Sequence, residues 1–447
     1  MTRGQTIKYS VISAGIAKIT SVILQFVSLP LAARVLGKEE FGVYSIVSLT
    51  IFVFSMLQLG VGPALSRCLA EASAKRRRNL ERHYYLNGAF LTISIVAIGA
   101  TLLATAVSFV PMEVIFGDKF SNYTDVLRSA LLLGICLTAI EIVLWHTDGT
   151  LEGYLEAYVM HYALSISNVI GGLAIVVGIR HFQSIEFMLI AITVPKIVSR
   201  LVCTGLLWKR RPYLIKKWTH LRAATLKTFL KDGISFSVTT NLAYIVEVFT
   251  CGLLVGRLLG PSDVAVYNIF ATFTTVFTGL ILMVVRPFWT AAIDASQKGD
   301  LEWLKSATYK LYLYFFSLLG LAGLGLIILG PFAVELLYGS EFQIPRFLFI
   351  AHFCFVAMAG LRSLNMYVMM GLGKLGKTVV PIVSGLIPGL LFAAFGLSKM
   401  QLPGMFLGLA LGIAIYPAWK LSKYILDHFQ SIAKNAAPLD TPQTTTP

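Results

Sequence analysis

Charged side chains are scarce in this chain, since Asp, Glu, Lys and Arg supply only 13% of its 447 residues. Soluble globular domains carry about 25%. Apolar residues instead make up 56% of the chain, and its mean hydropathy is +0.76. This composition excludes a fold whose whole surface is in contact with water, and it predicts a protein of the membrane class.

Cysteine is also rare, and no two of the five cysteines stand close together in the sequence. The seven histidines form no His-Glu-x-x-His or other metal-binding spacing, and no Cys-x-x-Cys pair occurs. We therefore expect no disulfide framework, no metal site and no cofactor. Most of the cysteines fall inside apolar segments, where they act as small apolar side chains. The five are Cys68, Cys136, Cys203, Cys251 and Cys354.

Long apolar runs are abundant in the sequence. About twelve segments of 18 or more residues recur along the chain, and each can cross roughly 30 Å of hydrocarbon as a helix with a rise of about 1.5 Å per residue. We therefore predict an all-α integral membrane protein with about twelve transmembrane helices. The predicted segments are 10–33, 42–66, 86–110, 127–147, 157–179, 184–208, 232–256, 264–288, 311–334, 346–370, 378–397 and 402–426.

The net charge of +15 arises from 37 Lys and Arg residues against 22 acids, and their placement indicates the topology. Basic clusters at 67–82 and 209–231 fall in segments that lie in the cytoplasm if the chain begins there. We therefore place both termini in the cytoplasm and the protein in the cytoplasmic membrane, with these clusters against anionic lipid. The excess positive charge does not require a nucleic-acid partner.

The chain contains two copies of one design. The stretch RVLGKEEFGVYSI at 34–46 reappears at 257–269 as RLLGPSDVAVYNI, a shift of 223 positions. Two further pairs keep nearly the same shift and the same order, which indicates an internal duplication. These pairs are 71–75 with 294–298, and 114–120 with 336–342.

Each copy holds six of the predicted segments, an even number, so both copies enter the membrane in the same orientation. The interface between the two copies is the expected place for a substrate cavity. We predict an N-terminal six-helix lobe at 1–208, a basic cytoplasmic linker at 209–231, a C-terminal six-helix lobe at 232–426 and a disordered cytoplasmic tail at 427–447.

Three of these stretches also carry a family resemblance. The pattern R-x-L-G-x-x-x-F-G-x-Y at 34–44, LGVGPALSR at 59–67 and F-G-x-x-F at 116–120 resemble those of the Wzx-type polysaccharide transporters. These transporters belong to a superfamily that also holds lipid II flippases and multidrug and toxin extruders. The resemblance implies a two-lobed helical bundle that alternates access by rocking one lobe against the other.

Ionisable residues inside the predicted segments are the candidate functional residues, because a charge at the bilayer centre costs about 2.5–3.5 kcal/mol on insertion scales. Each such residue should face a cavity or a partner. Cations outnumber acids, which suits an anionic cargo. The cations are Lys18, Arg128, Lys196, Arg200, Arg286 and Arg362, and the acids are Glu141 and Glu247.

A polar stripe is predicted on the first segment, where Lys18, Ser21 and Gln25 recur at helical spacing. Shifted by the repeat, Lys18 and Ser21 fall on Asn241 and Tyr244 of the seventh segment. Equivalent helices thus present polar faces. These faces either line a cavity or form interhelical hydrogen bonds that hold the bundle together.

Two pairs of charged residues are candidates for binding or gating. Lys196 and Arg200 follow Pro195 and lie one helical turn apart, so both can reach one anionic group. Alternatively they pair with acids of neighbouring helices, or extend toward the lipid headgroups. Glu141 and Arg362 occupy near-equivalent positions in the two copies and are expected to form either a gate or a static ion pair.

The resemblance and the buried cations together predict a flippase. Such a protein moves a polyprenyl-diphosphate-linked oligosaccharide from the inner to the outer leaflet in O-antigen, capsule or exopolysaccharide biosynthesis. Its anionic head is expected in a cationic cavity lined by Lys18, Lys196, Arg200 and Arg362, and Glu247 is a candidate for carrying a coupling ion. Membrane lipids and other membrane proteins of polysaccharide assembly are the expected partners.

Two other functions stay open at this point. A cation-coupled multidrug or toxin antiporter of the same superfamily would use Glu247, although the basic excess would repel an organic cation. A membrane polysaccharide polymerase or acyltransferase would need a substantial outer loop or an acid–base constellation, and the predicted outer loops are short. We therefore expect a transporter with no catalytic residues.

Overall fold

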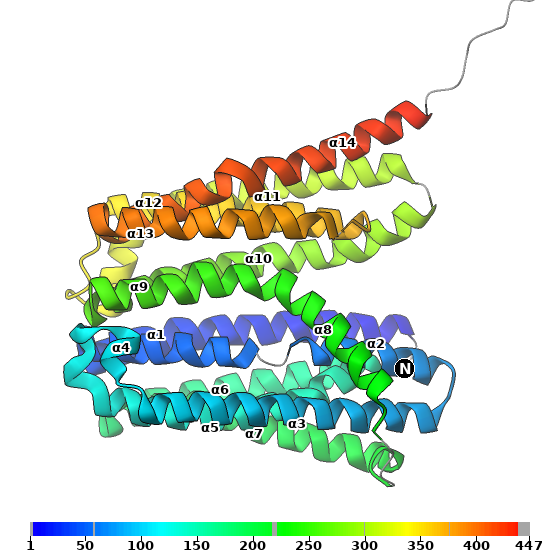
Figure 1. The fold of residues 1–447 in the computed structure, drawn as a ribbon, viewed down its shortest axis with the longest axis horizontal. Helices are drawn as coiled ribbons and strands as arrows, with labels where there is room; N and C mark the ends of the chain where they lie inside the picture. The colour runs from blue at the N-terminus through cyan, green and yellow to red at the C-terminus, as the bar shows by residue number, and fades with distance from the viewer. Residues whose placement is uncertain (1–2, 57–58, 217–220, 299, 375, 437–447) are drawn as a thin grey trace, which may run out of the picture. The chain divides into compact units, whose positions relative to one another are not determined.

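The computed structural model describes residues 3–56, 59–216, 221–298, 300–374 and 376–436, and for some helical residues it describes the backbone only. Every regular element in these ranges is a helix (Figure 1). The chain divides into two compact units. The first holds residues 1–269 with 334–343, and the second holds 270–333 with 344 onward.

The helices of the first unit follow the chain from one predicted segment to the next. They are α1 (Arg3–Ser55), α2 (Val61–Ala74), α3 (Arg78–Phe109), α4 (Met112–Phe116), η2 (Asp118–Tyr123), α5 (Thr124–Gly153), α6 (Ala157–Phe182), α7 (Ile185–Arg210), η3 (Pro212–Leu214), α8 (Ala223–Tyr244), η4 (Ile245–Thr250) and α9 (Cys251–Leu258).

Two long helices belong to both units. They are α10 (Pro261–Lys298), which begins in the first unit, and α11 (Leu301–Tyr338), which ends there. The remaining helices lie in the second unit. They are α12 (Arg346–Gly371), α13 (Gly376–Ile413), η5 (Ala414–Ala418) and α14 (Trp419–Ala436).

Nine helices in the described ranges are long and apolar enough to cross a membrane. They contain eleven of the predicted segments, because α1 holds the first and second, and the stretch 376–430 holds the last two. The seventh predicted segment corresponds to α8, the π-helical turn η4 and α9. The prediction of an all-α multi-pass membrane protein is therefore confirmed.

The internal repeat is visible in the backbone. Gly37, between the first and second predicted segments, has φ 80°, and its counterpart Gly260 has φ 105°. Gly117 and its counterpart Gly339 have φ 96° and 105°. Glycine adopts these left-handed values without the steric cost that a Cβ brings. The same residue type therefore stands at the same sharp turn in both copies.

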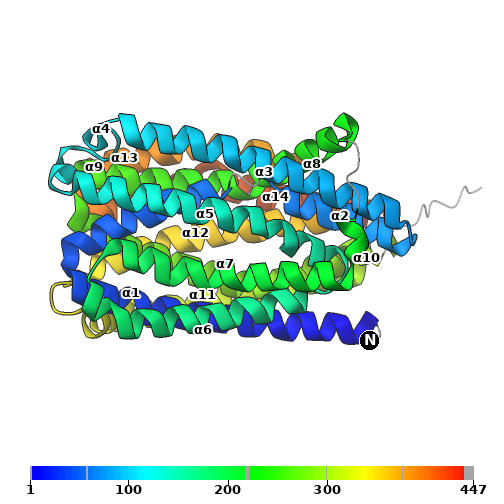
Figure 2. The same cartoon turned by 90° about the horizontal axis from the view of Figure 1, so that it is seen from below.

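In the first unit the helices pack in a continuous series. α1 packs against α6, α6 against α7, α7 against α5, and α5 against α2 and α3 (Figure 2). On α6, Ile166, Leu173 and Val177 recur on one face and are more than half exposed. Such an apolar outer face fits contact with lipid rather than with water.

In the second unit small residues bring the two parts of α13 together. A Cβ on Gly404 would lie 2.1 Å from the carbonyl oxygen of Gly396, and one on Gly412 would lie 2.2 Å from Cα of Gly389. A side chain at either position would collide with backbone. The glycines at four-residue spacing therefore serve close helix packing.

Candidate functional site

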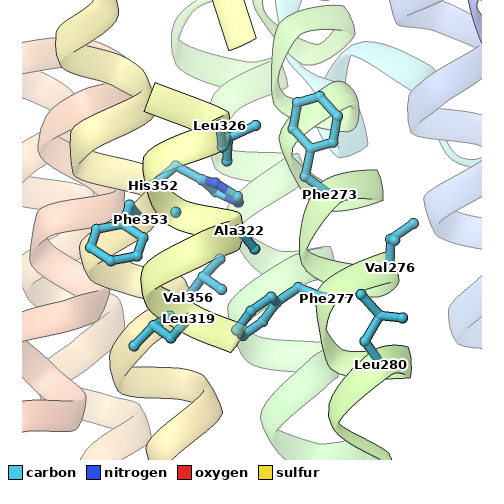
Figure 3. Close-up of a pocket in the computed structure, with 11 residues that line it drawn as sticks. Phe273, Val276, Phe277, Leu280, Leu319, Ala322, Leu326, His352, Phe353 and Val356 are labelled. Carbon is cyan, nitrogen blue, oxygen red and sulfur yellow. The ribbon is translucent and has the colours of Figure 1, made fainter. Parts of the chain in front are cut away.

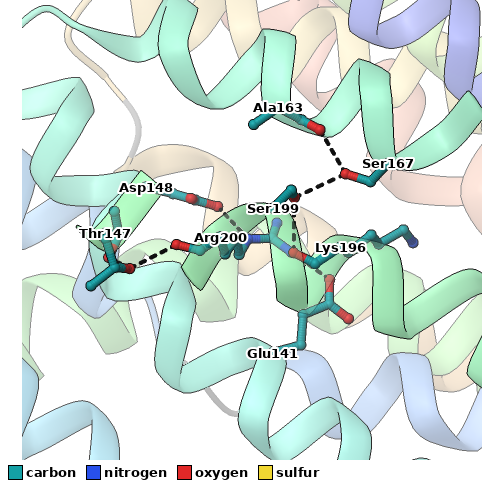
Figure 4. Close-up of polar contacts among 9 residues, drawn as sticks. Glu141, Thr147, Asp148, Ala163, Ser167, Lys196, Ser199 and Arg200 are labelled. Carbon is teal, nitrogen blue, oxygen red and sulfur yellow. Dashed lines mark hydrogen bonds and ion pairs between the residues drawn. The ribbon is translucent and has the colours of Figure 1, made fainter. Parts of the chain in front are cut away.

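The most strongly charged buried site lies between α5 and α7 (Figure 4). Arg200 Nη1 lies 2.6 Å from Glu141 Oε1, and its Nε lies 3.0 Å from Asp148 Oδ2. Glu141 and Asp148 are seven residues apart, or two helical turns, so both project from one face of α5. Arg200 projects from α7, one turn after the proline that interrupts this helix at Pro195.

All three side chains are largely removed from solvent. The exposed fractions of the Arg200, Glu141 and Asp148 side chains are 11%, 13% and 16%. The guanidinium also lies 5.5 Å from the ring centre of Trp145. Mutual pairing offsets part of the desolvation cost of these charges, although it leaves Asp148 Oδ1 buried without a hydrogen-bond partner.

Lys196 adds a second cation to this site. It lies one turn before Arg200 on α7, half-buried, and interacts electrostatically with both Glu141 and Arg200. Its amino end points away from Arg200 in Figure 4. Its carbonyl oxygen accepts a hydrogen bond of 2.9 Å from Ser199 Oγ. We call Glu141, Asp148, Lys196 and Arg200 the Arg200 cluster; formally it holds two cations and two anions.

The predicted stripe on α1 shares one face, as its spacing requires. Gln25 Nε2 donates to Ser21 Oγ at 3.4 Å, and Lys18 lies half-buried one turn before Ser21. Ser28 Oγ donates to the carbonyl of Leu24 at 2.5 Å. Whether this face lines a cavity stays a prediction.

The seventh predicted segment places its acid in an irregular turn. Glu247 is buried within the π-helical turn η4, and its carbonyl accepts a hydrogen bond of 3.2 Å from the Tyr267 hydroxyl. The ring of Tyr244 lies 4.7 Å from that of Phe52. π-Helical turns often occur at functional sites. The side chain of Asn241, like that of Arg286, lies outside the described residues.

The remaining predicted charges lie elsewhere. Arg362 is buried on α12 in the second unit. Its pairing with Glu141 stays a prediction, since Glu141 Oε1 is bonded to Arg200 in this structure. Arg200 thus has the contacts expected for the alternative, in which it pairs with acids of a neighbouring helix. Arg128 on α5 has its Nε buried without a hydrogen-bond partner.

Asp148 is the member of the cluster that the sequence analysis missed. The fourth predicted segment ended at 147, but α5 continues to Gly153. The spacing of seven residues between Glu141 and Asp148 was the available signal, because it predicts two carboxylates on one helical face.

The second unit contains a cavity of different character, formed by α10, α11 and α12 (Figure 3). It has a volume of about 150 Å³, and among its lining residues His352 is the one polar side chain. Phe273, Phe277 and Leu319 are among the apolar ones. This cavity suits an apolar group, and it offers no cation to an anionic head.

Metal chemistry finds no support within the ranges that the structure describes. No group of three or more His, Cys, Asp or Glu side chains there could hold a metal ion. The Arg200 cluster, with two acids and two cations, can bind or exchange ions and hydrogen-bond partners.

Comparison with known proteins places this geometry in context. The chain is 22% identical over 425 residues to a Yersinia pseudotuberculosis protein named for O-antigen export, covering 92% of this chain and 93% of the relative. It is 20% identical over 301 residues to a Salmonella typhi protein named as an O-antigen transporter, covering 66% of each.

The fold matches that of a solved transporter. An inward-facing multidrug resistance MATE family transporter of the MOP superfamily superposes with a TM-score of 0.77 at 15% identity, covering 94% of this chain and 99% of that one. The prediction of a fold with about twelve transmembrane helices is confirmed by this match. A model of the polysaccharide biosynthesis protein family matches residues 7–293, and the chain therefore belongs to that family.

Proposed function

We propose that this protein flips a lipid-linked oligosaccharide with an anionic diphosphate head from the inner to the outer leaflet of the cytoplasmic membrane. Family membership and the two relatives named for O-antigen export or transport support this cargo class. The observation that carries the proposal at residue level is the Arg200 cluster, a buried arginine shared between two carboxylates beside a lysine.

The cluster provides a way to bind phosphate without leaving bare charges in the membrane. In the present state Arg200 is satisfied by Glu141 and Asp148. A diphosphate offers oxygens of the same geometry and charge, so the guanidinium can exchange a carboxylate for a phosphate at little cost in hydrogen bonds. Lys196, one turn away, then supplies the second contact.

The released carboxylates need compensation in their turn. Protonation of Asp148 or Glu141, or their pairing with Lys196, would keep the site neutral once Arg200 has moved to the phosphate. Lys18 and Arg362 are further ligand candidates, and Ser21, Gln25, Asn241 and Tyr244 are candidates for lining the path. Glu247 is the candidate in the seventh segment for a coupling ion.

The proposed direction agrees with the membrane potential. With both termini in the cytoplasm, the basic clusters stay inside and the anionic head moves outward. A potential negative inside contributes about 2.3 kcal/mol per charge per 100 mV to outward movement of an anion. No covalent step is required, and the proposed activity is therefore transport rather than catalysis. Other membrane proteins of polysaccharide assembly are the proposed partners.

A second candidate function is cation-coupled extrusion of drugs or toxins. The fold match to a multidrug resistance transporter favours it. The cations of the Arg200 cluster oppose it, because an organic cation near Lys196 and Arg200 would be repelled. Drug susceptibility of a strain that expresses the protein separates the two functions: flippase activity predicts unchanged susceptibility together with restored surface polysaccharide.

The test uses a deletion strain of the source organism, complemented with variants of the full chain. We expect Arg200→Ala and Lys196→Ala to lower surface polysaccharide at least tenfold and to raise the lipid-linked intermediate on the inner leaflet. Arg180→Ala, which removes an exposed cation at the end of α6, is the matched control and should leave both quantities unchanged.

A neutral triple variant separates binding from folding. Arg200→Ala alone leaves two buried carboxylates without their partner and can lower the amount of folded protein. The variant R200A/E141Q/D148N carries no such charges and should reach the membrane at normal levels. If this well-expressed triple variant exports polysaccharide normally, Arg200 has only a structural role and the proposed head-group site is wrong.

A further inference from the structure

A second basic pocket lies in the second unit, far along the chain from the Arg200 cluster. It forms where α12 ends and α13 begins, and α14 closes its other side. Its volume is about 290 Å³. The predicted topology places this end of the helices on the cytoplasmic side. The lining residues are Met369, Lys374, Lys377, Tyr424, Asp427 and His428.

The pocket concentrates positive charge. Lys374 Nζ lies 2.7 Å from His428 Nδ1, so the ammonium donates to the imidazole and the ring proton of a neutral His428 sits on Nε2. Lys377 follows on the first turn of α13, and Asp427 is the one acid among the lining residues. Desolvation by burial, together with the charge of Lys377, lowers the pKa of Lys374. A bound anion would relieve this repulsion.

The backbone adds further donors. α13 begins at Gly376, between the two lysines, and its first turn contains no acidic residue. The first N–H groups of a helix have no partner within the helix and carry the positive end of its dipole. Phosphate groups bind at such positions in many proteins. Side chains and backbone therefore offer the same chemistry to one ligand.

Aromatic residues indicate that the pocket lies at the level of the lipid headgroups. Trp419 and Tyr424 lie on α14 beside it, and Lys420 Nζ stands 5.7 Å and 5.0 Å from their ring centres. Trp and Tyr are enriched at membrane–water interfaces, where a ring contacts acyl chains and a polar tip contacts water. A ligand of this pocket is thus in reach of the membrane surface.

An apolar ridge runs from the pocket along α13. It starts at Val380, one turn after Lys377 and on the same face, and its side chains are about two-thirds exposed. At about 1.5 Å per residue the ridge extends over roughly 22 Å, enough for an acyl chain of one leaflet. The exposed residues are Val380, Ile387, Leu391 and Phe395.

We propose that this pocket binds the phosphate of an anionic phospholipid, with an acyl chain lying along the α13 ridge. Lys374, Lys377 and the first N–H groups of α13 hold the phosphate, and His428 orients the Lys374 ammonium. Basic pockets between membrane helices on the cytoplasmic side are known to take anionic headgroups. The ridge selects a lipid over free phosphate, because free phosphate gains nothing from an apolar surface.

The experiment measures lipid binding by the purified full chain in detergent. Wild-type protein is titrated with phosphatidylglycerol, with phosphatidylcholine and with inorganic phosphate, and bound lipid is followed by native mass spectrometry and by the melting temperature. We expect K374A/K377A to raise the apparent Kd for phosphatidylglycerol at least tenfold. K420A/K423A removes the same charge from α14 outside the pocket lining and should change the Kd less than twofold.

Three outcomes would overturn the proposal. One is an equal loss of binding in both double variants, which would indicate general charge attraction. Another is stabilisation by inorganic phosphate at the same concentrations as by phosphatidylglycerol, which would identify a free-anion site. The third is an unchanged Kd in K374A/K377A. If K374A/K377A is poorly folded, K374Q/K377Q keeps side-chain length and is measured in its place, with the same expectation.

Discussion

Asn268 Nδ2 donates a hydrogen bond of 2.9 Å to Ser45 Oγ, and the two residues are 223 positions apart, the shift that separates the two copies of the repeat. Equivalent positions of the two copies therefore touch each other. Such a contact occurs where an internal two-fold axis passes between the copies. The sequence motif that reveals the duplication thus lies at the place where its two copies meet.

A double-mutant cycle can measure this contact. We expect Asn268→Ala and Ser45→Ala each to lower the free energy of unfolding, with a coupling of about 1 kcal/mol between them. Ser45 Oγ also donates to the carbonyl of Phe41 at 2.7 Å, which the single variant removes as well. Unfolding in detergent provides the measurement. Additive effects of the two substitutions would show that the bond contributes nothing.

Arg34 extends the contact between the copies. Its Nε donates to the carbonyl of Leu337 at 2.8 Å, and its Nη2 donates to that of Leu336, at the end of α11. In the other copy Lys119 Nζ donates to the carbonyls of Leu258 and Leu259, at the end of α9, at 2.9 Å and 3.2 Å. Each basic side chain thus satisfies carbonyls at a helix end belonging to the opposite copy.

Removing the Arg34 guanidinium should loosen this end of the molecule. We expect Arg34→Ala to lower the free energy of unfolding by about 1–2 kcal/mol, because carbonyls at the end of α11 lose charged donors. Arg34→Lys should retain part of this, since an ammonium cannot make both bonds in the same geometry. Thermal unfolding of the purified protein tests the order wild type, Lys, Ala; equal melting temperatures for all three would contradict it.

The sequence predicted the duplication and the glycine turns because both depend on local patterns. A turn that needs a left-handed φ restricts the residue at that position, so Gly37 and Gly260 recur at equivalent places. The helical segments followed from hydropathy for the same reason. The ends of the segments did not, since α5 continues as a helix past the last apolar residue and carries Asp148 into the protein.

The partners of the buried charges were harder to predict. Glu141 could pair with any cation that the fold brings within about 4 Å, and spacing along one helix does not say which neighbouring helix lies opposite. The repeat suggested Arg362, whereas the packing of α5 against α7 brings Arg200 to Glu141. The spacing of Lys196 and Arg200 did predict that both would lie on one face of α7.

Gly117 provides a test of the left-handed turn. A Cβ at this position would lie 2.9 Å from Cα of Arg257, and φ is already 96°. We expect Gly117→Ala to lower the free energy of unfolding by about 2 kcal/mol or more, from strain and collision together. Gly205→Ala is the matched control, because no atom lies within 4 Å of its Cβ and α7 is helical there. The control should be neutral or stabilising by up to about 1 kcal/mol.

A network of hydroxyls and a carboxylate fixes the start of the linker after α7. The hydroxyl of Tyr154 donates to Glu81 Oε2 at 2.8 Å, and the hydroxyl of Tyr213 donates to the same oxygen. Arg211 makes two hydrogen bonds with Glu156, of 2.6 Å and 3.1 Å, and stands 3.9 Å from the ring centre of Tyr154. These contacts tie η3 to the ends of α3 and α5.

The same network should make stability depend on alkaline pH. Burial raises the pKa of Tyr154 and of Tyr213, and their hydrogen bonds to Glu81 add to this. A raised pKa in the folded state means that the neutral phenol is favoured there, so its contribution is complete below the unfolded pKa of about 10 and is lost as pH rises above it. We expect the melting temperature of wild type to fall more steeply between about pH 9.5 and 11 than that of Y154F/Y213F. Tyr309→Phe, at an exposed tyrosine of α11, is the control and should follow wild type. Parallel curves for wild type and the double variant would show that neither phenol is linked to folding.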